Sequence, residues 1–136
     1  MNLRKSLDIV PSWVPATGHA LRHVGVHFDA VRIEGFLGED VAYRLMAFTD
    51  FQAGPIVREA TGGRNLYFLV PPGTVAGYDW PAPARALSGG GRSESYVGIP
   101  ALHGLTWPLD WRSRPTIEDP FVETELLHRT VKCAVR

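Results

Sequence analysis

The segment of residues 61–73 constrains the fold more than any other part of this chain. It runs Thr-Gly-Gly-Arg-Asn-Leu-Tyr-Phe-Leu-Val-Pro-Pro-Gly. The paired glycines are typical of a tight turn, and the residues after them alternate as they do in a β-strand. The two prolines then end the strand, because proline has no backbone N–H to donate to a neighbouring strand. The alternation predicts one face made of Leu66, Phe68 and Val70 and another made of Asn65, Tyr67 and Leu69.

Similar patterns predict further strands. Residues 24–33 alternate, with valines, Phe28 and Ala30 on one face and His27 and Asp29 on the other. Shorter strands are predicted at residues 56–59 and 95–99, with a short element near residues 85–87.

Two helices are predicted as well. The first opens at Gly38-Glu39-Asp40, and its apolar stripe contains Val41, Ala42, Leu45, Met46 and Phe48. The second starts at Asp119-Pro120, with proline in the first helical position, and its apolar side contains Val122, Leu126, Leu127 and Val131. The order β-α-β-β, an irregular stretch, β and α predicts an α+β fold. We expect a small, mostly antiparallel sheet with the helices packed on one face.

The length of 136 residues suits one domain with a single core. We expect a partly ordered lead-in at residues 1–22, one domain at residues 23–131, and a tail at residues 132–136. Fourteen basic and 14 acidic side chains cancel, so charge alone attracts the chain neither to nucleic acid nor to a membrane. The lone Cys133, and an N-terminus without a signal-peptide pattern, favour a cytoplasmic protein with no membrane association.

Three segments together suggest a family. They are Val-Gly-Val-His-Phe-Asp-Ala-Val at residues 24–31, Gly-Gly-Arg-Asn-Leu-Tyr-Phe at residues 62–68, and Ser-Tyr-Val-Gly-Ile-Pro at residues 95–100, which is followed by Trp107. This set resembles the bifunctional DNA primase/polymerase N-terminal domain over roughly residues 23–111. The resemblance implies a primase/polymerase-like core of RRM-like type and a role related to DNA replication. In that family, carboxylates on an open sheet face hold the divalent metals that bridge nucleotide phosphates.

The chain departs from that family at the positions that perform its chemistry. Asp29 matches the first carboxylate of the family, but Val31 stands where the second belongs, and Asn65 replaces a histidine. No acidic residue between Asp79 and Glu94 supplies the third carboxylate. One carboxylate and one amide cannot assemble a two-metal site, so we expect no catalysis and no cofactor. A divalent metal at Asp29 and His27 is the weak candidate that remains.

The residue pattern leaves a hypothetical ligand site. His27 and Asp29 are predicted to share a strand face, and Asn65 and Tyr67 could approach them from a neighbouring strand. Arg64, beside the paired glycines, could bind an anion. The plainer interpretation is a His–Asp hydrogen bond on a solvated face and an arginine at a strand edge. The predicted ligand-binding residues are His27, Asp29, Arg64, Asn65 and Tyr67.

The sequence therefore predicts a non-catalytic binding or accessory module for a nucleotide, a nucleic acid or a protein partner. Two alternatives stay open. One is a small enzyme with a rebuilt site around His27, Asp29 and Asn65. The other is a protein-interaction domain or homo-oligomer, with residues 107–111 or the terminal helix as its contact, which requires an exposed apolar patch.

Overall fold

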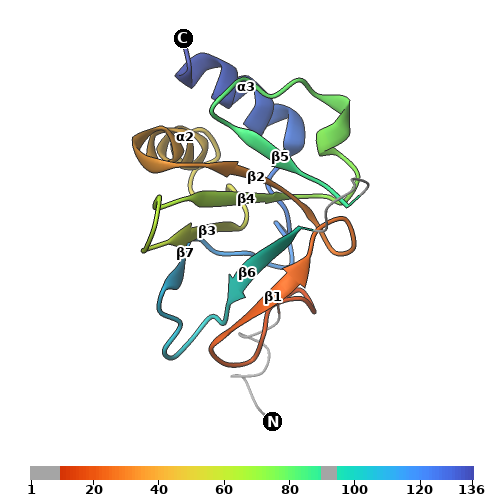
Figure 1. Ribbon diagram of the computed structural model, residues 1–136, viewed down its shortest axis with the longest axis vertical. Helices are drawn as coiled ribbons and strands as arrows, with labels where there is room; N and C mark the ends of the chain where they lie inside the picture. The colour runs from red at the N-terminus through yellow and green to blue at the C-terminus, as the bar shows by residue number, and fades with distance from the viewer. Residues whose placement is uncertain (1–9, 90–94) are drawn as a thin grey trace.

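The computed structural model describes residues 10–89 and 95–136. Its centre is a five-stranded antiparallel sheet with the strand order β5-β2-β4-β3-β7 (Figure 1). The strands of this sheet are β2 (Asp29–Ile33), β3 (Ile56–Glu59), β4 (Leu66–Val70), β5 (Arg85–Leu87) and β7 (Leu109–Ser113). A second, two-stranded antiparallel sheet pairs β1 (His19–His23) with β6 (Tyr96–Pro100). The helices are α2 (Gly35–Phe48), α3 (Thr124–Ala134) and the 3-10 turn η1 (Val75–Gly77).

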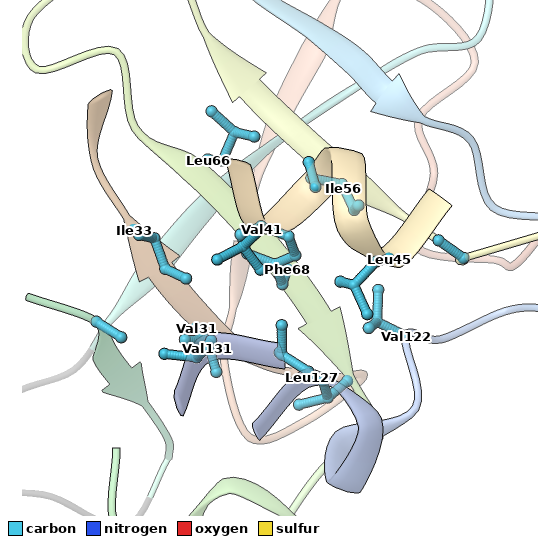
Figure 2. Packing of buried hydrophobic residues seen from close by; sticks show 14 of the residues in the cluster. Val31, Ile33, Val41, Leu45, Ile56, Leu66, Phe68, Val122, Leu127 and Val131 are labelled. Carbon is cyan, nitrogen blue, oxygen red and sulfur yellow. The ribbon is translucent and has the colours of Figure 1, made fainter. Parts of the chain in front are cut away.

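Both α-helices pack on one face of the large sheet. The faces of β4 are those that the alternation predicts, because Leu66, Phe68 and Val70 belong to the helix-side core and Tyr67 and Leu69 to the other. Figure 2 shows how side chains from β2, β3 and β4 meet those of both helices in the helix-side core. The labelled residues are Val31, Ile33, Val41, Leu45, Ile56, Leu66, Phe68, Val122, Leu127 and Val131. The expected α+β fold with an antiparallel sheet is confirmed.

The opposite face of the sheet is also covered, in contrast to the open sheet face of the family that the sequence resembles. A second core gathers Val57 and Leu69 of the large sheet with Val97 and Ile99 of β6. Trp13 closes this core, and its ring lies 5.2 Å from that of Phe28 at an angle of 67°. Because apolar side chains line both faces, the sheet is a central layer and not an exposed platform.

The expected strand at residues 24–33 is interrupted. Gly25 has a φ of 89°, which lies in the left-handed region and cannot continue a strand. Its N–H donates to the carbonyl of Phe28 at 2.7 Å, so the chain turns between β1 and β2. The predicted strand is present from residue 29 onward, where β2 begins, but the face that carries Asp29 is buried and not solvated.

Both helices begin elsewhere than the sequence predicts. Helix α2 starts at Gly35, so Glu39 and Asp40 lie beyond its first residues, and Phe48 is exposed instead of buried. Helix α3 starts at Thr124 and not at Asp119-Pro120, with the Glu123 side chain accepting a hydrogen bond from the backbone of Leu126. Before α3, the N–H of Val122 donates to the carbonyl of Leu69 at 2.7 Å, which holds this segment extended against the sheet.

The ordered elements cross the expected domain boundaries. Trp13 lies before residue 23, β1 spans the expected boundary between residues 22 and 23, and α3 continues to Ala134. Residues 1–9 of the expected lead-in lie outside the described residues. Within the described ranges, no helix combines the length and apolar character needed to cross a lipid bilayer.

Candidate functional site

The pairing of β2 with β4 separates the predicted site residues. Asp29 is opposite Val70 at one end of this pair, and Ile33 is opposite Leu66 at the other end. Asn65 and Arg64 precede Leu66, so they lie at the far end of the strand pair from Asp29. The expectation that Asn65 approaches Asp29 is therefore wrong, because antiparallel pairing places the start of one strand beside the end of the other.

Asp29 lies in the interior of the protein. Its side chain is 1% exposed, and its Oδ2 atom accepts a hydrogen bond from the N–H of Val75 at 3.4 Å. Burial raises the pKa of the Asp29 carboxyl, and backbone hydrogen bonds from Val75, Gly73 and Thr74 lower it in part. This carboxylate holds the loop after β4 against β2 and does not face solvent.

His27 and Tyr67 are also apart from each other. His27 is exposed in the turn between β1 and β2. Tyr67 is opposite Arg32 and packs against the core on the β1–β6 side, away from the helices. Burial raises the pKa of the Tyr67 hydroxyl, and the charge of Glu59 raises it further. The five predicted residues therefore do not form one site.

A pocket does surround the paired glycines. It has a volume of about 800 Å³ and lies between the start of α2, the end of β3, the Gly62-Gly63 turn and the loop that leads into β7. We call it the turn pocket. Of the predicted residues, Arg64 lines it, and Asn65 stands behind it with its amide donating to Glu59 Oε1 at 3.1 Å. The lining residues are Gly35, Phe36, Glu39, Arg58, Glu59, Ala60, Gly62, Gly63, Arg64, Thr106, Trp107, Pro108, Leu109 and Asp110.

One wall of the turn pocket is an ion-pair network. Arg58 Nη2 lies 2.7 Å from Asp110 Oδ2, and Arg58 Nη1 lies 3.5 Å from Glu39 Oε2. Arg112 Nε donates to the other Glu39 oxygen at 2.8 Å. The hydrogen bond to Asp110 raises the pKa of Arg58, so this guanidinium stays charged. The network joins α2 to β3 and β7.

The mouth of the turn pocket carries two exposed aromatic side chains. Phe36 is 96% exposed and Trp107 is 72% exposed, and both line the pocket. Arg64 makes no hydrogen bond or ion pair through its side chain with any residue that the structure describes. Its φ of 54° lies in the left-handed region, where a residue other than glycine costs about 1–2 kcal/mol. Rings and an unpaired guanidinium are suited to binding a flat, anionic molecule.

Sequence reasoning missed most of this site. Phe36 was visible as an aromatic residue outside the apolar stripe of the first helix, which is a signal of exposure. Arg58, Asp110 and Glu39 are far apart in the sequence and meet only through strand pairing and helix packing. Among the described residues, no group of three or more histidine, cysteine, aspartate or glutamate side chains is placed to hold a metal ion.

No protein-family model matches the chain, and neither a curated protein nor a solved structure does. The resemblance to primase/polymerase domains therefore rests on the three sequence segments alone.

Proposed function

We propose that this chain is a non-catalytic, primase/polymerase-like binding module that holds a nucleotide unit in the turn pocket. The nucleotide is either free or exposed in a single strand. The observation that carries the proposal is the pair of exposed rings, Phe36 and Trp107, at the mouth of this pocket. Nucleobases stack on such rings with little dependence on sequence.

Two polar side chains of the pocket can bind the polar parts of the same ligand. Arg64 is the lining guanidinium that other described side chains leave unpaired, and it can bind a phosphate. Glu59 has its Oε1 occupied by Asn65, and its carboxylate can still accept from the exocyclic amino group of a base. A nucleotide combines a planar ring, amino donors and a phosphate, which match these three kinds of group.

The position of Asp29 supports a role without metal-dependent catalysis. This residue is the one carboxylate that matches the resembled family, and it is buried against backbone N–H donors. Metal-assisted phosphoryl transfer requires several oxygen ligands around one accessible site. We therefore expect nucleotide binding that is the same with and without Mg²⁺.

The test is a calorimetric titration of the full chain. The ligands are nucleoside monophosphates, nucleosides, inorganic phosphate and short single-stranded oligonucleotides. Trp107→Ala is expected to weaken nucleotide binding by about five- to 150-fold, because a base–aromatic stack contributes about 1–3 kcal/mol. Arg64→Gln is expected to weaken the binding of nucleotides and to leave the binding of nucleosides unchanged. Tighter binding of the oligonucleotides than of the monophosphates would identify a single strand as the ligand.

Matched controls exist in the chain. Leu105→Ala removes another exposed apolar side chain from the same loop, and Arg85→Gln removes an exposed arginine outside the pocket. Both variants should bind like the parent. The absence of nucleotide binding, or equal affinities for Trp107→Ala and Leu105→Ala, would contradict the proposal.

A further inference from the structure

A second concave surface lies between α2 and α3 and shares no residue with the turn pocket. It has a volume of about 570 Å³, and we call it the helix groove. Tyr43 and Phe48 contribute to it from α2, and Leu126 from α3. The groove is therefore formed by the two helices that cover the sheet, on residues that nucleotide binding does not involve.

The groove exposes large apolar side chains that the core does not use. Tyr43 is 67% exposed and Phe48 is 76% exposed, although other residues of α2 are buried against the sheet. Leu126 packs against the edge of the helix-side core and also lines the groove. Aromatic rings that border an apolar groove are typical of protein-binding surfaces.

The charged side chains that line the groove are both cationic. Arg44 projects from α2 and Arg129 from α3, so each helix contributes one guanidinium. Asp40 lies 3.0 Å from Arg44, but both side chains are more than 40% exposed, and such a pair is weak enough for an incoming carboxylate to replace. A two-fold related copy of the chain would bring the same basic surface against itself. Charge complementarity therefore favours an acidic partner over a second copy.

We infer that the helix groove binds an acidic amphipathic helix of a partner protein. The apolar residues of that helix, three and four positions apart, lie against Tyr43, Phe48 and Leu126, and its carboxylates pair with Arg44 and Arg129. Helix α3 has 11 residues, which corresponds to a length of about 16 Å. A peptide of three to four helical turns is therefore long enough to occupy the groove.

The test uses two labelled peptides of about 14 residues with the same apolar positions. One carries glutamate and the other lysine at the flanking positions, and binding to the full chain is followed by fluorescence anisotropy. The glutamate peptide is expected to bind about tenfold more tightly than the lysine peptide, and less tightly as salt is added. Phe48→Ala should weaken the binding of the glutamate peptide by about tenfold.

A charge-reversed variant and a control from the other site make the test specific. The combined Arg44→Glu and Arg129→Glu variant should prefer the lysine peptide, and Phe36→Ala should bind both peptides like the parent. The inference is overturned if neither peptide binds, if the charge reversal leaves the preference unchanged, or if light scattering shows a dimer that Phe48→Ala dissociates. These outcomes are independent of nucleotide binding.

Discussion

The two ends of the β2–β4 strand pair differ more than their sequences suggest. At one end, Phe28 and Asp29 are both buried, and the loop that follows β4 lies against Asp29. At the other end, Phe36 and Arg64 are exposed around the turn pocket. Each end combines a phenylalanine with an ionisable side chain, yet one combination stabilises the fold and the other is available to a ligand.

The difference comes from what covers each end. Trp13 and the β1–β6 sheet cover Phe28, and the backbone N–H groups of residues 73–75 surround Asp29. At the other end, the rings of Phe36 and Trp107 belong to neither core and stay exposed beside the Gly62-Gly63 turn. An ionisable residue that suggests a functional site in the sequence, such as Asp29, thus serves the fold where another segment covers it.

The largest expected effect compares the two phenylalanines. Phe28→Ala should lower the free energy of unfolding by about 3–5 kcal/mol, because a fully buried ring leaves a cavity. Phe36→Ala should change it by less than about 0.5 kcal/mol, because this ring is exposed. Urea unfolding followed by circular dichroism measures both values. Similar losses in the two variants would mean that the ends are not distinct.

A smaller effect concerns how stability depends on pH at the end of the β2–β4 pair that contains Asp29. Burial raises the pKa of Asp29 above its ordinary value of 3.8, so the folded chain binds this proton more tightly than the unfolded chain. The resulting stabilisation is present below that ordinary value and is lost as the pH rises through the raised pKa. Asp29→Asn keeps an acceptor for the Val75 N–H but cannot ionise.

The melting temperature of Asp29→Asn should therefore exceed that of the parent at neutral pH, and the two should converge near about pH 3. Asp50→Asn is the control, because Asp50 is exposed after α2 and takes part in neither core. A parent protein that instead gains stability relative to Asp29→Asn as the pH rises would show that the carboxylate is stabilised by its N–H donors.

The smallest effect concerns the backbone of Arg64, at the end of the β2–β4 pair beside the turn pocket. Arg64→Gly relieves a left-handed conformation in the turn, so the free energy of unfolding should stay the same or rise by up to about 1 kcal/mol. The same variant should lose the contribution of the guanidinium to nucleotide binding. Thermal melts measure the stability and calorimetry measures the nucleotide affinity. Unchanged or higher stability together with weaker nucleotide binding would show that Arg64 serves a ligand and not the fold.

The short-range features of the fold were predictable. The Gly62-Gly63 turn, the alternation along β4 and the stop at Pro71 depend on residues that are neighbours in the chain. Strand β3 was predicted with its observed bounds, because its pattern is also local. The predicted helix starts were wrong, since contacts such as that between Val122 and Leu69 override the preference of Asp119-Pro120 for a helix start.

The sequence by itself thus determined the class of fold, the turn and the two faces of β4, because those follow from backbone preferences and alternation. Only the tertiary structure decided that Asp29 is buried while Arg64 is exposed to solvent. Antiparallel pairing places these two residues at opposite ends, and the burial of Asp29 depends on residues 73–75, which are distant from it in the chain. The exposed rings and guanidinium at the turn pocket, and not the matched carboxylate, therefore form the surface on which the proposed function rests.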